Sequence, residues 1–427
     1  MVKIIKYPSR EDWDEITARP AMDHSHLFDD VKKILDDVRL NGDRAVALYC
    51  EKFDKAVLNQ FTVSPNEMNH AERLVSDGLK AAIRCAAANI ETFHRSQLHA
   101  PQKTETAPGV VCWQKAVPVE KVGLYIPGGT APLFSTVLML AIPAHIAGCR
   151  EITVCTPPAN DGSIHPAILY TAQLAGVNRI FKIGGAQAIA AMTYGTETVP
   201  RVYKIFGPGN QYVTAAKQLA ALRDVAIDMP AGPSEVEVIA DETANPAFVA
   251  ADMLSQAEHG NDSQAILVTT HEAIVQPVIA ELRRQLHALP RKETAARSLE
   301  HSRIIVFKDS NEVMDFTNAY APEHLIIETG DCAALAERVI HAGSVFLGHY
   351  TPESAGDYAS GTNHTLPTNG YARMYSGVNL DSFMKKITFQ EITPSGLRGI
   401  APAIETMAQT ESLVGHSNAV RLRMEYS

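Results

Sequence analysis

The chain has 427 residues, 46% of them hydrophobic and 20% charged, which is the composition of an ordinary globular protein with more than one domain. Its formal net charge is −10 and it has no strongly basic run, which argues against nucleic acid as the main partner. The longest apolar stretch, APLFSTVLMLAIPAHIAG, is broken by Pro143 and His145 and is too short to span a membrane.

The N-terminus lacks the apolar core of a signal peptide, and none of the 6 cysteines forms a CxxC pair. We therefore expect a reduced, cytoplasmic protein without a disulfide framework.

Residues 11–97 are expected to be mostly helical. The segment HLFDDVKKILDDVRLNGD has apolar residues at helical spacing and stops at Asn41-Gly42. A later segment, NEMNHAERLVSDGLKAAIRCAAANIETFHRSQ, continues the pattern. A β-leaning segment with prolines follows, APGVVCWQKAVPVEKVGLYIPGG.

From there, short β-rich runs alternate with helical patterns. The first set of strands is VGLYIPGG, EITVCTPP, RIFKIGGAQ and KIFGPGN, and such alternation predicts βαβ units with a parallel sheet. After AIDMPAGPSEVEVIAD, a second alternation of helices and strands runs through QAILVTT and RIIVFK, which predicts a second α/β sheet. From about residue 379 we expect a helical tail with a break near Gly415.

Glycines end three of the first strands, where they would let backbone amides approach an anionic ligand: Gly128-Gly129, Gly184-Gly185, and Gly207 with Gly209. GPGNQY approaches the dinucleotide fingerprint GxGxxG, but Tyr212 replaces the third glycine. Asp228 follows at about the distance of the ribose-binding acid. This incomplete motif is a weak signal, because tight α/β turns need glycine anyway.

A metal-binding pattern lies in MLSQAEHGND. Gln256 and His259 are three residues apart in a predicted helix, so both side chains can reach one ion. The segment is not HExxH, and a lone helical histidine is more often structural.

More candidate ligands lie in the loop TPESAGDYASGTNH, which contains Glu353, Asp357 and His364, and in the tail, which contains His416. Nitrogen and oxygen donors of this kind suit zinc or a similar ion. The spacing alone does not choose between His364 and His416, or between Glu353 and Asp357.

In NAYAPEHLII, Glu323 lies beside His324. Adjacent residues of a strand point to opposite faces, so the two side chains could serve one site only from irregular backbone. Pro322 favours such backbone, because it biases Ala321 away from helix.

These stretches together resemble histidinol dehydrogenases, the zinc- and NAD-dependent family that completes histidine biosynthesis. The matching segments include VGLYIPGGTAPLFSTVLMLAIPAHIAGC, IGGAQAIAA, AIDMPAGPSEV, MLSQAEHG, APEHLII, PESAGDYASGTNHTLP and ESLVGHSNAV. They extend from about residue 120 to the C-terminus, and the helical N-terminal third is compatible with the family.

The resemblance implies a role for each matching residue. Zinc would be bound by Gln256, His259, Asp357 and His416, with His364 left structural. Glu323 and His324 would be the catalytic pair. NAD would contact Tyr125, Gln187 and Asn210. The substrate, L-histidinol, would contact the four zinc ligands together with Ser234, His324 and Glu411. The family binds NAD without the full glycine fingerprint, so Asp228 loses its apparent role.

The implied fold is α/β, with two Rossmann-like parallel-sheet domains. We expect a helical N-terminal segment over 1–22 and a first α/β domain over 23–124 plus 234–378, which would hold the catalytic and zinc site. The NAD-binding domain would cover 125–233, and a small helical tail domain, 379–427, would be exchanged in a homodimer. In that arrangement His416 and Glu411 come from the partner chain, and a tail that serves its own chain is the alternative.

The implied reaction oxidises L-histidinol through L-histidinal to L-histidine, with two hydride transfers to NAD and one addition of water. His324 would take the hydroxyl proton, and Glu323 would activate or orient the water. Two other readings are open: a related zinc- and NAD-dependent dehydrogenase of another amino alcohol or diol, and a zinc hydrolase that needs no nicotinamide.

Overall fold

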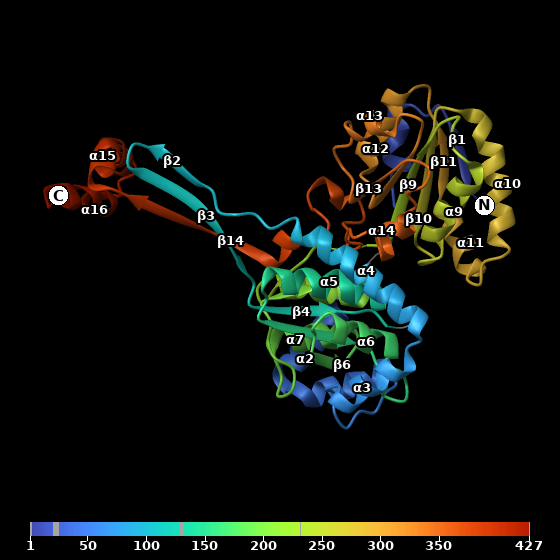
Figure 1. Ribbon diagram of the computed structural model, residues 1–427, viewed down its shortest axis with the longest axis horizontal. Coiled ribbons are helices and arrows are strands. Elements are labelled where there is room, and N and C mark those ends of the chain that lie inside the picture. Colours follow the sequence, from blue (N-terminus) through green and yellow to red (C-terminus); the bar gives the residue numbers. More distant parts are fainter. Residues whose placement is uncertain (1, 20–24, 129–131, 231, 427) are drawn as a thin grey trace.

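The computed structural model describes residues 2–19, 25–128, 132–230 and 232–426. Figure 1 shows two α/β units, each built around one sheet, and a long arm that extends away from both and ends in the C-terminal helices. The α/β class with two parallel sheets is therefore confirmed. No helix in the described ranges combines the length and the hydropathy needed to cross a membrane.

The larger sheet has six parallel strands in the order β1-β11-β10-β9-β12-β13. Their bounds are β1 Lys3–Lys6, β9 Glu235–Ala240, β10 Gln264–Thr269, β11 Arg303–Val306, β12 His324–Glu328 and β13 Ser344–Leu347. Its central strands β9, β10 and β12 are buried at every position, because helices cover both faces of the sheet. The longer helices of this unit are α9 Pro246–Ala257, α10 Val275–Leu286, α11 Lys292–His301 and α12 Ser310–Tyr320, and the shorter ones are η1 Arg10–Asp12, α1 Trp13–Ile16, η3 Glu272–Ile274, α13 Cys332–Ala336 and α14 Glu353–Tyr358.

The smaller sheet has five parallel strands in the order β6-β5-β4-β7-β8. The strands are β4 Lys121–Tyr125, β5 Glu151–Thr156, β6 Arg179–Lys182, β7 Lys204–Phe206 and β8 Ala226–Ile227. Between them run α5 Phe134–Ala147, α6 Pro166–Leu174, α7 Gly185–Tyr194 and α8 Gln211–Ala221. The chain runs outward from β4 through β5 to β6 and then returns to β7 on the other side, so the switch point lies between β4 and β7.

The N-terminal helices pack on the five-stranded sheet, whereas the sequence assigned residues 23–124 to the unit of the other sheet. They are α2 Ser25–Tyr49, the short π-helix η2 Cys50–Asp54, α3 Pro65–Leu74 and α4 Asp77–Arg95. Helix α2 contacts α7 and α8, α3 contacts α6, and α4 contacts α5. Their apolar faces belong to the two core clusters of that sheet. We therefore propose that the five-stranded unit includes these helices.

Residues 1–22, expected to be helical, begin with the strand β1, which pairs with β11 at the edge of the six-stranded sheet. The short helices η1 and α1 follow it.

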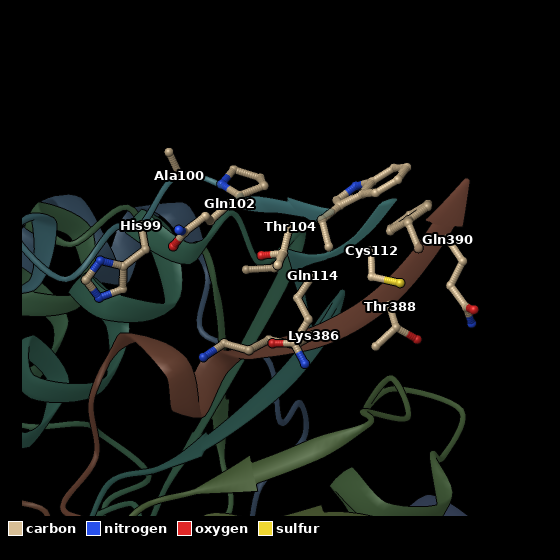
Figure 2. A pocket seen from close by; sticks show the side chains of 13 residues that line it. His99, Ala100, Gln102, Thr104, Cys112, Gln114, Lys386, Thr388 and Gln390 are labelled. Carbon is tan, nitrogen blue, oxygen red and sulfur yellow. The ribbon is translucent and has the colours of Figure 1, made fainter. Parts of the chain in front are cut away.

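The arm is a three-stranded antiparallel sheet in the order β14-β3-β2, and it carries two helices at its tip (Figure 1). The strands and helices of the arm are β2 Lys103–Ala107, β3 Val110–Pro118, β14 Met384–Ile392, α15 Pro394–Thr410 and α16 Val414–Glu425. The short helices η4 Tyr371–Arg373 and η5 Leu380–Phe383 precede β14. The tail expected to be helical from about residue 379 therefore contains the strand β14, between the short helix η5 and the helix α15. Beside the arm lies a pocket of ≈ 580 Å³, lined by residues 99–102, by Thr104 and by side chains of β3 and β14 (Figure 2).

Candidate active site

The amino-terminal edge of the six-stranded sheet brings the predicted catalytic residues together. Strand β12 begins at His324 and pairs with β9, whose first residue is Glu235. Ser234 directly precedes β9 and so lies at the same edge. Since open α/β sheets usually bind ligands at their carboxyl edge, this location is unusual.

The turn before β12 explains how Glu323 and His324 can share a site. Ala321 caps helix α12 in the left-handed conformation, with φ 54°, and Pro322 follows it. Few non-glycine residues adopt this conformation, and here it reverses the chain between the helix and the strand. Glu323 therefore lies before the regular strand, and its side chain is not forced to the opposite face from that of His324.

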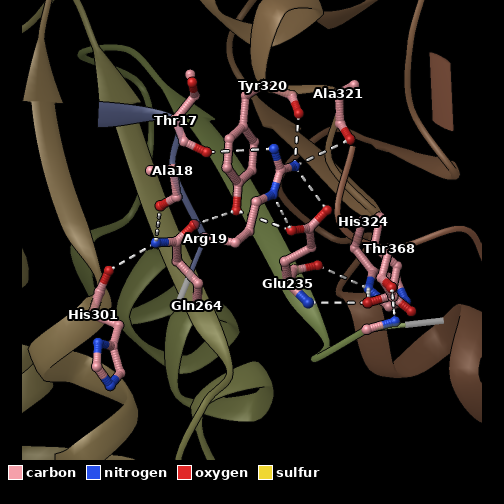
Figure 3. A network of polar contacts seen from close by, with 12 residues as sticks. Thr17, Ala18, Arg19, Glu235, Gln264, His301, Tyr320, Ala321, His324 and Thr368 are labelled. Atoms are coloured by element: carbon pink, nitrogen blue, oxygen red, sulfur yellow. Dashed lines mark hydrogen bonds and ion pairs between the residues drawn. The ribbon is translucent and has the colours of Figure 1, made fainter. Parts of the chain in front are cut away.

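Hydrogen bonds to β9 orient both side chains (Figure 3). The backbone amide of Glu235 donates to Glu323 Oε2 at 3.0 Å. His324 Nδ1 lies 3.2 Å from the carbonyl oxygen of Glu235 and 3.6 Å from Glu323 Oε2. A proton on Nδ1 satisfies both contacts, and His324 Nε2 is then left without a hydrogen-bond partner although it is buried. The imidazole thus presents one free nitrogen to the site.

The metal candidates lie directly beside this nitrogen. His324 Nε2 is 3.5 Å from Asp357 Oδ1. One ligand atom from each of His259, Glu353 and Asp357 lies within 4.8 Å of the other two. His259 follows the end of α9, and the two carboxylates come from α14, so two helices supply the cluster.

Gln256 and Glu353 are paired within this cluster. The Gln256 amide nitrogen donates to the two carboxylate oxygens of Glu353 at 2.6 and 3.3 Å, whereas the opposite orientation would set oxygen against oxygen. Both residues are buried. Sequence reasoning left Glu353 and Asp357 as alternatives, but the structure places both at the cluster.

Burial and neighbouring charges shift the pKa values of Glu323 and His324 in the same direction. Burial raises the pKa of Glu323 to about 8, although the adjacent His324 opposes that shift. For His324 burial alone would lower the pKa, but the carboxylates of Glu353, Glu323 and Asp357 outweigh it and raise the pKa well above its usual value. The Glu323 carboxyl is therefore suited to exchange a proton near neutral pH.

The neutral form is favoured for the other two imidazoles near the cluster. Desolvation by the surrounding protein lowers the pKa of both His259 and His364. Asp357 behaves oppositely, because its contact with His324 outweighs its burial and lowers the pKa of the carboxyl. Neutral imidazole and ionised carboxylate are the forms that bind a metal ion.

His364 joins the site to the five-stranded unit. Its Nδ1 lies 2.9 Å from the carbonyl oxygen of Asp357, and its Nε2 lies 3.1 Å from the hydroxyl of Thr136, in the first turn of α5. The catalytic cluster thus faces the helix that follows the first glycine-rich turn of the smaller sheet.

Arg19 holds Glu235 in place, and no pattern in the sequence indicated this role. Its guanidinium donates to both carboxylate oxygens of Glu235, at 2.7 and 2.9 Å, and stacks on the Tyr320 ring at 3.9 Å (Figure 3). The two charges lie 216 residues apart in the chain, so no local pattern could reveal the pair. This bidentate ion pair holds the first residue of β9 in place.

The tail residues are not brought to the cluster of their own chain. Glu411 caps the end of α15 and His416 lies in α16, and both are exposed. The two helices pack on each other at the tip of the arm, away from both sheets (Figure 1).

The carboxyl edge of the five-stranded sheet holds the predicted cofactor contacts. Tyr125 ends β4, and its hydroxyl accepts a hydrogen bond from the amide of Gly185 at 3.1 Å. Gln187 is in the first turn of α7, and its Oε1 is buried without a partner. Asn210 caps α8 and accepts from the first backbone amides of that helix. All three flank the switch point or the strands next to it.

Close backbone packing at this edge requires glycine. At Gly207, with φ 122°, a Cβ atom would lie 2.1 Å from the carbonyl oxygen of Tyr125. The turn is also held by Asp228, which accepts from the Gly207 amide at 2.8 Å and pairs with Lys217 at 2.5 Å. Asp228 is therefore a structural residue of this turn.

The residues present fit both an ion and a dinucleotide. The cluster offers an imidazole nitrogen and carboxylate oxygens beside the unpartnered His324 Nε2, which is the donor set that zinc accepts. The switch point of the smaller sheet offers glycine turns, helix amino termini and the unpartnered Gln187 oxygen to a dinucleotide. Fold and site together define a metal- and dinucleotide-dependent oxidoreductase.

Comparisons with known proteins name the family. Residues 17–424 match the histidinol dehydrogenase family model, and the chain belongs to this family of NAD- and zinc-dependent enzymes of histidine biosynthesis. It is 66% identical to the histidinol dehydrogenase of Bacteroides thetaiotaomicron over 99% of both chains, and 52% identical to that of Escherichia coli K12 over 97% of both.

Solved structures agree with this assignment. The crystal structure of histidinol dehydrogenase from Elizabethkingia anophelis superposes with a TM-score of 0.98 at 55% identity, covering 100% of this chain and 98% of that one. An acetylating aldehyde dehydrogenase from Geobacillus thermoglucosidasius reaches a TM-score of 0.50 at 15% identity, over 89% of this chain and 94% of that one, which indicates a related fold alone.

Proposed function

We propose that this chain oxidises L-histidinol through L-histidinal to L-histidine at the amino edge of the six-stranded sheet, with NAD bound at the carboxyl edge of the five-stranded sheet. The observation that carries the proposal is the contact of His324 with the cluster of Asp357, Glu353 and His259. The His364–Thr136 contact supports it as well, because it brings this cluster next to the dinucleotide-binding unit.

Gln256, His259 and Asp357 would hold the zinc ion, together with His416 of a tail. A zinc ion held there would supply a positive charge suited to nitrogen donors of the substrate. Glu353 then has the task of orienting Gln256, since it accepts both hydrogen bonds from that amide. Ser234, at the same edge, and Glu411, on the tail, would contact the substrate.

His324 acts as the general base at its Nε2 atom. Its Nδ1–H group donates to the carbonyl oxygen of Glu235, which fixes the ring and the tautomer. In the neutral ring, Nε2 can therefore take the hydroxyl proton of the alcohol. A bound NAD would supply the hydride acceptor. The aldehyde hydrate is again an alcohol, so the same nitrogen can act in the second oxidation.

Glu323 handles the water that adds to the aldehyde. Its carboxyl is buried, accepts only the Glu235 amide from the backbone, and has its pKa raised to about 8 by that burial. In its ionised form this carboxylate can take a proton from the attacking water, while the protonated His324, whose Nδ1 lies 3.6 Å away, gives its Nε2 proton to the aldehyde oxygen. The products are the hydrate and a neutral His324.

A homodimer completes the site in this proposal, with Glu411 and His416 donated by the partner. The arm supports it in two ways. First, it holds both residues away from the cluster of their own chain (Figure 1). Second, it exposes apolar side chains that an isolated monomer would leave in water: Ile387, Phe389, Ile392, Met407, Val414 and Leu422. The pocket beside β3 and β14 lies on the same arm.

A cytoplasmic location belongs to the same proposal. All 6 cysteines are free thiols, which is typical of a reducing compartment.

The direct test is NADH formation from L-histidinol, followed by absorbance before and after removal of the metal with a chelator. We expect about two NADH per histidinol oxidised, loss of the activity in the stripped protein, and recovery when zinc is added. A protein that forms no NADH with any amino alcohol, but hydrolyses a test ester in a metal-dependent way, would instead be a zinc hydrolase.

A further inference from the structure

The five-stranded sheet lacks the acid that usually selects its dinucleotide. In Rossmann-type folds an Asp or Glu near the end of the second strand binds the adenosine ribose. Here the second strand is β5, and it ends with Cys155 and Thr156, followed by Pro157. Asp228, the acid at fingerprint distance, follows β8 on the other side of the switch point and is engaged by Lys217.

Another carboxylate reaches this position from the N-terminal helices. Asp54 is the last residue of η2, and the left-handed Lys55, with φ 58°, turns the chain directly after it. The chain then runs antiparallel along the free edge of β6, where Thr62 pairs with Phe181. This pairing anchors the segment that carries Asp54 at the carboxyl end of β6.

The contacts of Asp54 place it next to the end of β5. Its Oδ2 accepts from the Gln187 side-chain amide at 3.1 Å and from the Gly184 amide at 3.4 Å. A Cβ atom on Gly184 would lie 2.7 Å from Asp54 Oδ1 and 2.5 Å from Pro157 Cβ. Asp54, the turn before α7 and the residue after β5 therefore meet at one point.

Gly128, which follows β4, lies at the same point. A Cβ atom on Gly128 would lie 3.0 Å from Pro157 Cγ. A dinucleotide whose phosphates lie beside Gly128 and the amino end of α5 would thus have its adenosine ribose close to Pro157 and Asp54.

Asp54 has accepting capacity left for a ligand. Burial raises the pKa of its carboxyl, and the donors Gly184, Cys50 and Gln187 oppose that shift. These donors leave at least one lone pair of the two oxygens unused, because a carboxylate can accept about four hydrogen bonds. The side chain is half-buried, so a ligand can reach it.

We propose that Asp54 is the residue that selects NAD over NADP, by accepting hydrogen bonds from the adenosine ribose hydroxyls and by repelling a 2′-phosphate. The inference rests on the proposed function, since it assumes that the dinucleotide lies along Tyr125, Gln187 and Asn210. The acid then comes from a separate helix instead of from the second strand, and it excludes the wrong cofactor by charge.

The test compares Asp54→Asn and Asp54→Ser with the wild type by calorimetric titration of NAD+ and NADP+, and by kcat/KM for each cofactor. Serine keeps a small acceptor for the Gly184 amide at the amino end of α7, in case asparagine disturbs the turn. Glu51→Gln is the matched control, because it removes the same charge from an exposed position of the same short helix.

We expect NAD+ affinity to fall roughly 10-fold or more in both Asp54 variants, as for loss of a hydrogen bond to a charged group, while NADP+ affinity holds or rises. Glu51→Gln should keep the wild-type preference. An equal loss for both cofactors would mean that Asp54 only positions Gln187, and an unchanged preference would give it no role, so either result overturns the inference. If the wild type and the control also fail to bind NAD+, the proposed function itself is wrong.

Discussion

The proposed role of His324 depends on the different contacts of its two ring nitrogens. Nδ1 is occupied by the carbonyl oxygen of Glu235, whereas Nε2 is buried without a partner. His324→Ala should therefore lower turnover by about 10²–10⁴-fold, the usual contribution of a general base, while the zinc content per chain stays at the wild-type value. Turnover by absorbance and zinc by atomic emission check this, and a variant that also loses its zinc would make His324 a metal ligand.

Glu323 should affect the two oxidations unequally. In the proposed mechanism Glu323 activates the water that adds to the aldehyde. Glu323→Gln should therefore slow the conversion of L-histidinal to L-histidine more than the oxidation of L-histidinol to L-histidinal. Rates measured separately from the alcohol and from the aldehyde compare the two halves. Equal losses in both halves would contradict the division of tasks between Glu323 and His324.

Glu353 should act on the metal through Gln256. Removing the carboxylate in Glu353→Ala should weaken zinc binding about 10–100-fold, as is typical for a partner that orients a ligand. Glu353→Gln keeps an oxygen that can accept from the Gln256 amide, so it should lose less. Zinc competition with a coloured chelator measures both variants. Similar losses in the two would indicate that Glu353 binds the ion directly.

Strand β9 contains a buried acid, Glu237, whose contribution to the stability of the protein depends on pH. Burial raises the pKa of Glu237 to about 8, although Thr317 donates a hydrogen bond to it. The folded protein keeps a proton that the unfolded chain loses, so this contribution is complete below pH ~4.5 and disappears as the pH rises through 8.

Glu237→Gln should therefore flatten the loss of stability with rising pH. Glutamine needs no proton to be buried, and it keeps an oxygen for the Thr317 hydroxyl. The melting temperature of the variant, relative to the wild type, should rise between pH 5 and pH 8. Glu242→Gln, at an exposed position beyond the same strand, is the control and should not change with pH. A constant difference for Glu237→Gln would mean that the carboxyl is ionised in the folded protein.

The elements differ in how far the sequence predicted them. The strands β10 and β11 have apolar interiors, and the sequence predicted them from the runs QAILVTT and RIIVFK. Strand β14 was expected to be helical, because nearly all of it is exposed and no burial pattern marks it. Its nine residues are held by pairing with β3, which lies more than 260 positions away.

Within the site, helical spacing grouped Gln256 with His259. The sequence placed Glu353 and Asp357 in one loop as alternative ligands, and the structure forms helix α14 there. The sequence alone could not place those two segments beside His324, and the resemblance to the family supplied that expectation. Arg19 and Asp54 were missed for the same physical reason. Each acts on residues more than 100 positions away, so only the folded chain brings the partners together.

In the whole molecule, two chains would together build each active site. In this proposal the six-stranded unit supplies His324 and three zinc ligands. The arm carries His416 and Glu411 away from that unit (Figure 1). Each dimer would then have two sites, each with the body of one chain and the tail of the other.

The most direct test is a purified heterodimer of His324→Ala and His416→Ala chains, co-expressed with different affinity tags. One of its two sites then joins an intact body to an intact tail, so about half of the wild-type NADH formation from L-histidinol should return. A heterodimer of His324→Ala with Glu323→Ala, in which both bodies are defective, should stay inactive. If the His324→Ala and His416→Ala heterodimer is as inactive as its parents, each tail serves its own chain and the shared site does not exist.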